Sequence, residues 1–278
     1  LLFTSFASAG ELKLQDLIFE ALKNNPEILA SEARVSASKH RVPQVKSLPD
    51  PMFMAGYQNE GFDRYTYGET ADAQWMFSTS QMIPFPGKLS LKGEMAEKDS
   101  ESLKASSESV RLQTILKVKE LFYNLFLACK SIDLVKEKSE LFSRIEDAAL
   151  SRYSTGMTQQ QEVLMAQTEK YMLIEKEEML KQKIQSLEGM LNSTVGRDVN
   201  SPVGRPAEPA PTAYTFGMDA LLKIATDNSP EIKSREKMLA SADAKVRMAK
   251  KEYFPDFTIT GSIMKKKEPF EDMWSLTT

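Results

Sequence analysis

The sequence has very little of the chemistry that most enzymes and metal sites require. Among 278 residues there is one cysteine, Cys129, and one histidine, His40, which excludes a disulfide framework and a Cys/His zinc cluster. A Ser/His/Asp triad would have to use His40. There is also no phosphate-binding glycine loop and no metalloprotease helix motif. We therefore expect no catalytic residues, no metal ligands and no cofactor, and we predict that the chain is not an enzyme.

Long apolar runs and a strong excess of one charge are missing as well. No stretch approaches the ~18 consecutive apolar residues that a membrane-spanning helix needs. The 36 Lys and Arg residues are balanced by 39 Asp and Glu residues, so no global positive field would attract nucleic acid. With 41% hydrophobic and 27% charged residues, the composition is that of a folded chain. Any partner must be recognised locally.

The first nine residues have the pattern of the end of an export signal. Apolar residues 1–6 lead into Ala7-Ser8-Ala9, a small-x-small pattern like that before a signal-peptide cleavage site. We interpret residues 1–9 as a signal-peptide remnant, and the alternative is a mildly apolar chain end. Export would place the protein beyond the inner membrane of a bacterium.

What the sequence does contain is an internal repeat. The segment 17–28 is matched by the segment 221–232, a spacing of 204 residues that also separates Pro26 from Pro230 and continues without gaps to Phe53 and Phe257. One structural unit is therefore used twice, as in a duplicated half-protein.

The repeat divides the chain into three parts. Residues 10–194 form the first repeat, and residues 195–213, which contain four prolines, form an irregular linker. Residues 214–278 begin the second repeat, which we expect to be truncated and to hold only the opening strand of its strand pair.

The first repeat begins with helical patterns and continues with alternating ones. Residues 12–48 predict two short helices with a break before Pro26, because proline suits the first turn of a helix. Alternation then predicts a β-hairpin over residues 52–83. One face of this hairpin and of the matching later strand is apolar, and the other is polar. The apolar residues are Phe53, Tyr57, Trp75, Phe77, Phe257 and Ile259, and the polar ones are Gln58, Gln74, Ser78, Thr258 and Thr260.

A long helical hairpin is expected over residues 88–194. Apolar residues from Ile115 to Ile132 recur in alternating steps of three and four, the spacing of a coiled coil. The turn falls at residues 154–157, so that the two helices run antiparallel. A sharp turn from strand to helix precedes the hairpin. We expect Pro84, Pro86 and Gly87 to form it.

These motifs carry a resemblance to a known family. Ala21-Leu22-x-x-Asn25-Pro26-Glu27-Ile28, Leu48-Pro49-Asp50-Pro51, Arg152-Tyr153-x-x-Gly156 and Val163-Leu164-x-Ala166-Gln167 resemble, in order and spacing, the TolC-type outer membrane efflux proteins, or outer membrane factors. The resemblance covers nearly the whole chain. It implies a mainly α fold with a long antiparallel coiled-coil hairpin, a duplicated half-repeat, and strands that contribute to a trimeric transmembrane β-barrel.

The resemblance also implies a function in the bacterial outer membrane, with a periplasmic extension. The chain would be the outer membrane channel of a tripartite efflux or secretion system, a homotrimer that works with a periplasmic adaptor (membrane fusion) protein and an inner-membrane pump. Its apolar strand face would contact outer membrane lipid and its polar face would line the lumen. The hairpin tip would contact the adaptor through Arg152, Tyr153, Thr155, Gly156 and Met157.

The sequence leaves the cargo open. Residues 80–89 are similar to the Ser-Gln-x-Ile-Pro-x-Pro-Gly-Lys-Leu stretch of the branch associated with heavy-metal cation efflux, which favours metal cations. Drug export or type I protein export by the same family is the alternative, and a periplasmic coiled-coil scaffold without a pore is the rival from another class. Met52 and Met54 would lie on the lumen face, where thioethers suit soft metals, but we interpret the methionines in general as packing residues.

Overall fold

The structure, a computed structural model, describes residues 11–210, 213 and 215–278. The signal-peptide remnant expected at residues 1–9 lies outside the described residues. The chain divides into two compact units. One unit consists of the chain up to Glu32 together with Ser107–Asn228, and the other consists of Ala33–Ser106 together with Ser229–Thr278.

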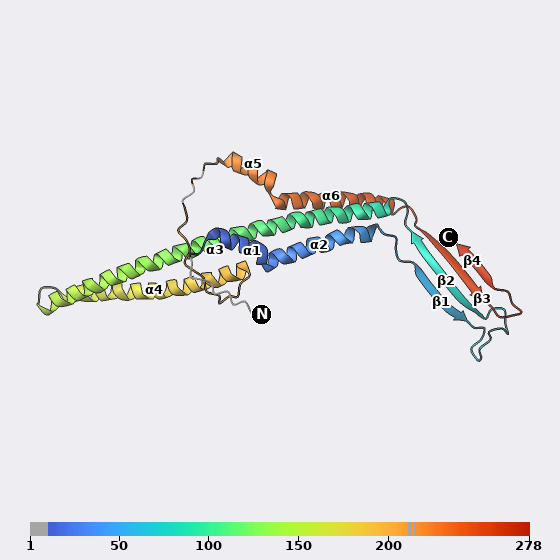
Figure 1. Cartoon of the computed structure of the whole chain (residues 1–278), viewed down its shortest axis with the longest axis horizontal. Coiled ribbons are helices and arrows are strands. Elements are labelled where there is room, and N and C mark those ends of the chain that lie inside the picture. The colour runs from blue at the N-terminus through green and yellow to red at the C-terminus, as the bar shows by residue number, and fades with distance from the viewer. Residues whose placement is uncertain (1–10, 211–212, 214) are drawn as a thin grey trace. The chain divides into compact units, whose positions relative to one another are not determined.

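Helices account for most of the described residues, which confirms the prediction of a mainly α fold (Figure 1). The four strands form a single sheet in the second unit. In chain order the elements are α1 (Leu14–Asn24), α2 (Pro26–Lys46), β1 (Met52–Gln58), β2 (Gln74–Ile83), α3 (Lys88–Ser154), α4 (Gln160–Val195), α5 (Met218–Asn228), α6 (Pro230–Lys251), β3 (Phe257–Lys265) and β4 (Met273–Thr277).

The sequence repeat is reproduced in the helix boundaries. Both ends of α5 follow those of α1 by the repeat spacing, and α6 begins the same distance after α2. The break between the paired helices is capped at equivalent positions. The side chain of Asn25 accepts hydrogen bonds from the backbone N–H groups of Glu27 and Ile28, at 2.9 and 3.1 Å, and Ser229 accepts one from that of Ile232, at 3.4 Å. Side-chain acceptors at this position start the second helix of each pair.

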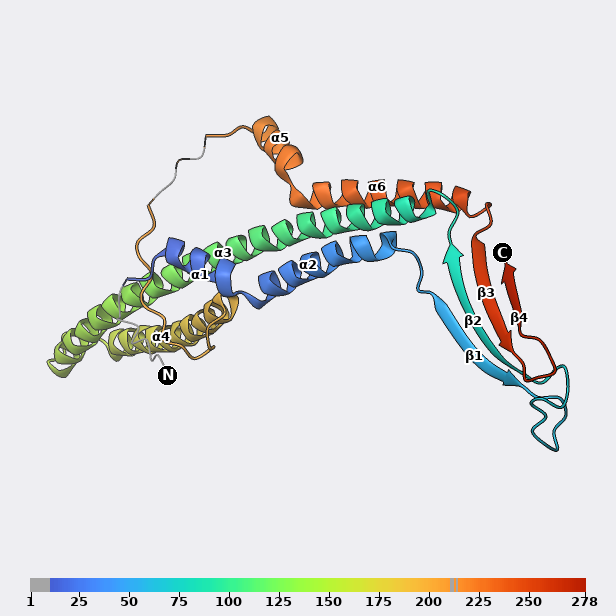
Figure 2. The same ribbon diagram turned by 45° about the vertical axis from the view of Figure 1, so that its right-hand side comes forward.

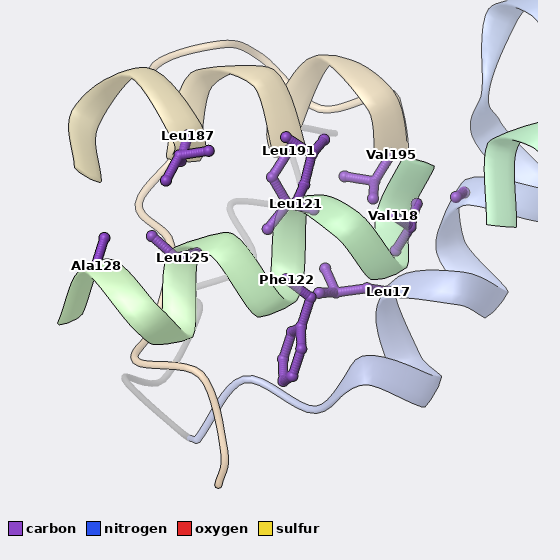
Figure 3. Packing of buried hydrophobic residues seen from close by; sticks show 10 residues of the cluster. Leu17, Val118, Leu121, Phe122, Leu125, Ala128, Leu187, Leu191 and Val195 are labelled. Carbon is purple, nitrogen blue, oxygen red and sulfur yellow. The ribbon is translucent and has the colours of Figure 1, made fainter. Parts of the chain in front are cut away.

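The core of the first unit lies where α1 and the end of α4 pack on the middle of α3. Phe122 and Leu125 of α3 are almost completely buried there, as are Leu17 of α1 and Leu191 of α4 (Figure 3). The coiled-coil spacing expected in α3 therefore produces a packed seam. The cluster consists of Leu17, Ala21, Val118, Leu121, Phe122, Leu125, Ala128, Leu187, Leu191 and Val195.

The start of the first unit differs from the expected helix over residues 12–24. Leu12 precedes α1 and pairs with the linker instead. Its N–H donates to the carbonyl of Arg205 at 2.8 Å, and its carbonyl accepts from the N–H of Ala207 at 2.9 Å. These two bonds give both backbone groups of Leu12 a partner. This short pairing holds part of the proline-rich linker beside the helices, which local periodicity does not encode.

In the second unit, α2 and α6 run antiparallel to the first part of α3, one on each side of it (Figures 1 and 2). Their contacts use small hydroxyl side chains. Ser38 of α2 donates to Ser100 of α3 at 3.0 Å, and the hydroxyls of Ser102 and Ser234 are hydrogen-bonded at 3.0 Å between α3 and α6. Small residues let helix backbones approach closely, and the paired hydroxyls satisfy one another. These helices can therefore pack with few large apolar residues.

The sheet is antiparallel, in the order β1-β2-β3-β4. β1 and β2 are the hairpin expected over residues 52–83, and β2 pairs with β3 of the second repeat from Trp75 to Ile83. The expectation that the second repeat holds only one strand was wrong, because Met273–Thr277 forms β4 and pairs with β3. Within the described residues the sheet is open, with β1 and β4 at its edges.

Candidate functional site

One face of the sheet consists mostly of large apolar side chains. Phe77 pairs with Ala55 on one side and with Ile263 on the other, and Ile263 pairs with Trp274. Since side chains alternate between faces, this register gathers one apolar set from all four strands. We call it the apolar face. Its exposed members are Phe53, Trp75, Phe77, Ile83, Phe257, Ile259, Ile263, Trp274 and Leu276.

The exposure of the apolar face is unusual for a folded chain in water. Phe53 and Trp274 are 79% and 78% exposed, whereas the helical core of the first unit buries its apolar residues to a few per cent. Scattered exposed apolar side chains are normal, but a contiguous set across a whole sheet marks a surface that contacts protein or lipid. The apolar face is therefore a candidate interaction surface.

The opposite face of the sheet has a different chemistry. Ser78 pairs with Met54 and Ser262, and Ser262 pairs with Ser275, so hydroxyl groups form a row across the sheet. We call this side the hydroxyl–methionine face. It bears no charged side chain within the strands. Its members are Gln58, Gln74, Ser78, Ser80, Thr258, Thr260, Ser262, Ser275 and Thr277, with Met52, Met54, Met76, Met82, Met264 and Met273.

The connection from β2 to α3 is held by a buried lysine. The side chain of Lys88 is 3% exposed, and its ammonium donates to Asp256 Oδ1 and to the carbonyl of Phe254, each at 2.8 Å. Asp256 also accepts from the backbone N–H of Phe85 at 2.8 Å. The hydrogen bond to Asp256 raises the pKa of Lys88, and the same bond, followed by that from Phe85, lowers the pKa of Asp256.

Proline and glycine shape this connection. Pro84 is buried, Pro86 is exposed, and Gly87 has a φ of +91°, in the left-handed region that other residues avoid. Between the prolines, the ring of Phe85 stacks on that of Phe254, with centroids 4.6 Å apart. The turn thus fixes both the polypeptide direction and the position of Lys88 at the first residue of α3.

The tip of the helical hairpin is a closed and exposed helix end. The N–H of Met157 donates to the carbonyl of Arg152 at 2.9 Å, and that of Gly156 donates to Tyr153 at 3.0 Å, which together form a Schellman motif. Gly156 has a φ of +76°. The hydroxyl of Thr155 donates to the carbonyl of Arg152 at 3.0 Å. The side chains of Tyr153 and Met157 are exposed at this closed turn.

Comparison with known proteins identifies the family of this chain. The profile of the family described as outer membrane efflux protein matches residues 17–196, more than half of the chain. The chain belongs to the outer membrane efflux protein family. This confirms the family identified from the sequence motifs. A sequence search among curated proteins finds no significant match.

Solved structures with the same fold include several outer-membrane channels. The chain is similar to the outer-membrane channel OprN (16% identity, TM-score 0.76) over 95% of its own residues and 62% of that chain. It is also similar to VceC of Vibrio cholerae (16%, 0.74), over 95% of its residues and 66% of that chain. With CusC the values are 18% and 0.72, over 99% and 68%. The chain thus spans about two thirds or less of the length of OprN and VceC.

The strand residues predicted from the sequence lie on two faces of the sheet. Phe53, Tyr57, Trp75, Phe77, Phe257 and Ile259 all lie on the apolar face, and Gln58, Gln74, Ser78, Thr258 and Thr260 lie on the opposite face. Their contacts with lipid and lumen remain predictions.

Tyr57 differs from the other apolar-face residues because it is partly covered. Its ring stacks on that of Tyr65, with centroids 4.9 Å apart, and lies 5.1 Å from Trp75 and 6.3 Å from Tyr67. These four aromatic rings form a cluster at the loop end of β1 and β2. The alternation that predicts the β-hairpin over residues 52–83 does not indicate this cluster, although three of the four rings belong to tyrosines within a short stretch.

Sequence reasoning also missed Lys88, Asp256 and β4. Lys88 belongs to the Pro-Gly-Lys motif, but nothing local indicates that its partner lies in the second repeat. The outer strand β4 has only five residues, among them Trp274 and Leu276 of the apolar face. Both features depend on pairing between segments far apart in the sequence.

Outside the sheet and the hairpin tip, the described residues offer few candidates for a reactive or metal-binding site. Cys129 is half-buried on α3, and burial raises the pKa of its thiol. The described residues bring together no group of three or more His, Cys, Asp or Glu side chains able to hold a metal ion. Among the helices of the described part, none has the length and apolar character needed to cross a bilayer.

Proposed function

We propose that the chain forms part of the outer membrane channel of a tripartite efflux system, and that the apolar face of its sheet contacts outer membrane lipid. The observation that carries this proposal is the division of one four-stranded sheet into an exposed apolar face and a hydroxyl–methionine face. Strands of transmembrane barrels alternate in this way because one face meets lipid and the other lines a water-filled lumen. In this proposal Ser78 and Thr260 line the lumen, and substrate leaves by diffusion.

Closure of the barrel requires other copies of the chain. The edge strands β1 and β4 carry backbone N–H and C=O groups that would be unsatisfied in hydrocarbon, and these cost several kcal/mol each by rough estimate. Pairing with the edges of neighbouring copies satisfies them, and a closed ring has no edges. A homotrimer, as the family resemblance implies, would supply these partners and locate the protein in the outer membrane, with its helices in the periplasm.

The hairpin tip is the proposed contact with a periplasmic adaptor protein, which would link the channel to an inner-membrane pump. Met157 is 74% exposed, and Tyr153 and Arg152 are exposed beside it. Met adapts to irregular partner surfaces, and Tyr combines apolar area with a hydroxyl. Photo-crosslinkers placed at Thr155 and Met157 of the full-length protein should capture the adaptor. A crosslinker at the exposed Leu141, which precedes the tip on α3, is the matched control and should capture none.

Metal cations are the proposed cargo, supported by the resemblance of residues 80–89 to the heavy-metal branch. Drugs or proteins are the alternative within the family. Deletion of the gene separates them: loss of resistance to silver and copper salts supports metal efflux, whereas unchanged metal resistance with increased drug sensitivity supports the alternative. Reintroduction of the gene should restore the lost resistance.

The channel itself is tested with the purified full-length protein in planar lipid bilayers. We expect stepwise conductance and a trimer that resists detergent until it is heated. The rival function is a periplasmic coiled-coil scaffold without a pore. A full-length protein that is monomeric in detergent-free buffer and conducts no ions would overturn the channel and support the scaffold.

A further inference from the structure

The hydroxyl–methionine face carries a row of methionines that the register brings together from three strands. Met76 of β2 pairs with Met264 of β3, and Met264 pairs with Met273 of β4. Directly paired residues on one face of an antiparallel sheet have Cβ atoms about 4.5–5.5 Å apart. Three thioethers, one from the first repeat and two from the second, therefore stand side by side. The row ends on β1 at Gly56, which pairs with Met76.

A fourth methionine lies within reach of this row. Met54 of β1 pairs with Ser78, which places it diagonally to Met76. Diagonal neighbours are about 7–8 Å apart, a separation that long side chains can bridge. Methionine has three rotatable side-chain bonds, so its sulfur can move toward a shared point. The neighbouring row, Met54 to Ser275, supplies hydroxyl groups and no carboxylate.

Packing does not account for the methionine row as it accounts for methionines in a core. Met273 is 51% exposed and Met54 is 70% exposed, while Met76 and Met264 are half-buried. These methionines are therefore accessible on the hydroxyl–methionine face of the sheet. Thioethers are soft ligands that select Cu(I) over hard cations such as Mg²⁺ and Ca²⁺, which need carboxylates.

We propose that Met76, Met264 and Met273, assisted by Met54, form a thioether site for a soft monovalent cation, Cu(I) or Ag(I). Thioether sulfur is a neutral donor, so the site has no ionised ligand to add charge attraction for the cation. The affinity of a single site is therefore low enough for the ion to be released. That the ion meets this site on its way out rests on the proposed function. The binding itself depends only on the sheet.

Silver is the probe of choice because Ag(I) is stable in air. The purified full-length protein and all variants carry Cys129→Ser, which removes the free thiol that would otherwise bind silver. Each protein is dialysed against silver nitrate in chloride-free buffer, and bound silver is measured by elemental analysis. We expect about one Ag(I) per chain, with sulfur neighbours in the silver X-ray absorption spectrum. The triple variant M76L/M264L/M273L should lose this silver, because leucine keeps the volume and removes the sulfur.

The matched control replaces three other exposed methionines, in the variant M165L/M172L/M179L on α4. It should bind as much silver as the wild type. A gain-of-function variant keeps the test valid if the triple variant does not fold. Gly56→Met extends the row, and a Cβ at this position meets no atom within 4 Å. A fourth thioether in the row should tighten Ag(I) binding by roughly tenfold.

The outcomes separate this inference from the proposed channel. Silver that is retained in the M76L/M264L/M273L variant, or lost from the α4 control, overturns the site. A wild-type protein that conducts ions in bilayers but binds no Ag(I) through sulfur also overturns the site and leaves the channel standing. A protein that binds Ag(I) through these methionines but forms no channel supports the site and refutes the channel.

Discussion

The ammonium of Lys88 and the carboxylate of Asp256, 2.8 Å apart, join the first residue of α3 to the residue that precedes β3. This ion pair links the two sequence repeats, because Lys88 belongs to the first and Asp256 to the second. Glu252 adds a weaker contact to Lys88 at 3.6 Å. A buried ammonium is costly without a partner, so the pair fixes where the second repeat meets the first strand-to-helix turn.

The first prediction concerns the pH dependence of this pair. The pKa of Asp256 is lowered below its ordinary 3.8, so its contribution to stability is present above that pH and is lost as pH falls through the folded value. The pKa of Lys88 is raised above 10.5, so its contribution is present below that pH and is lost as pH rises through the folded value.

Asp256→Asn should therefore lower the thermal midpoint at pH 7 and reduce the further loss that the wild type shows on acidification below pH 3.8. Thermal melts of the full-length protein between pH 2 and pH 7, followed by circular dichroism, measure both. Asp50→Asn, an exposed carboxylate in a loop, is the control and should behave as the wild type. Equal acid sensitivity in the wild type and Asp256→Asn would contradict the assigned role.

Two helix-ending glycines allow a matched test of backbone strain and close approach. Gly156 and Gly196 both have positive φ, +76° and +82°, and both close Schellman motifs. A Cβ on Gly156 would meet no atom within 4 Å, whereas one on Gly196 would lie 2.5 Å from the carbonyl oxygen of Asn24.

Gly156→Ala should therefore destabilise by about 1 kcal/mol, the cost of a left-handed residue with a side chain. Gly196→Ala should cost roughly 1–3 kcal/mol more, since the backbone must also shift. Chemical denaturation of both variants measures the difference. If the two substitutions cost the same, the end of α1 does not approach Gly196 as described.

The two equivalent helix caps should differ in strength. Asn25 is buried, accepts two backbone hydrogen bonds, and donates through Nδ2 to the carbonyl of Thr194 at 2.8 Å. Ser229 is more accessible and accepts one bond at 3.4 Å. We expect Asn25→Ala to cost about 2 kcal/mol and Ser229→Ala about 0.5 kcal/mol. Denaturant midpoints provide the measurement, and a larger loss for Ser229→Ala would refute this ranking.

The core of the first unit provides the largest expected loss of stability. Phe122 is 2% exposed at the junction of α1, α3 and α4, while its neighbour Tyr123 is 46% exposed. Phe122→Ala should destabilise by about 3–5 kcal/mol, because it removes buried apolar area and leaves a cavity. Tyr123→Ala is the control at the next position of the same helix. It should cost about 1 kcal/mol or less, as measured by denaturant unfolding.

The sequence predicted the features that depend on local patterns and did not predict those that depend on contacts between distant segments. The alternation in residues 52–58 and the heptad spacing around Phe122 are local patterns, and both predicted the correct elements. The pairing of Leu12 with the linker and the ion pair of Lys88 with Asp256 join distant segments, and no local pattern indicates them. Helix α2 is rich in small polar residues, and its serine contacts with α3 became apparent only when the helices were placed together.

The candidate site was predictable in its chemistry but not in its register. Period-two alternation separates Phe77 from Ser78 whatever strand pairs with β2. The methionine row, by contrast, exists only because Met264 falls opposite Met76 and Met273. A shift of β3 by one residue would have placed Ile263 there instead, so the row depends on long-range pairing that the sequence alone does not specify.

The two faces of β2 provide the last prediction. Phe77 and Ser78 are adjacent in one strand, so their depths in a membrane would be nearly equal and only the face differs. Phe77→Arg places a charge on the apolar face, where an arginine near the bilayer midplane costs about 2–4 kcal/mol, and we expect loss of the full-length protein from the outer membrane fraction. Ser78→Arg faces the lumen in the proposed channel, and it should leave assembly of the heat-sensitive trimer intact while changing conductance. Quantifying membrane-inserted trimer before and after heating distinguishes the two. If both variants assemble normally, the apolar face does not meet lipid and the scaffold becomes the better explanation; if both fail equally, the assignment of the two faces is wrong.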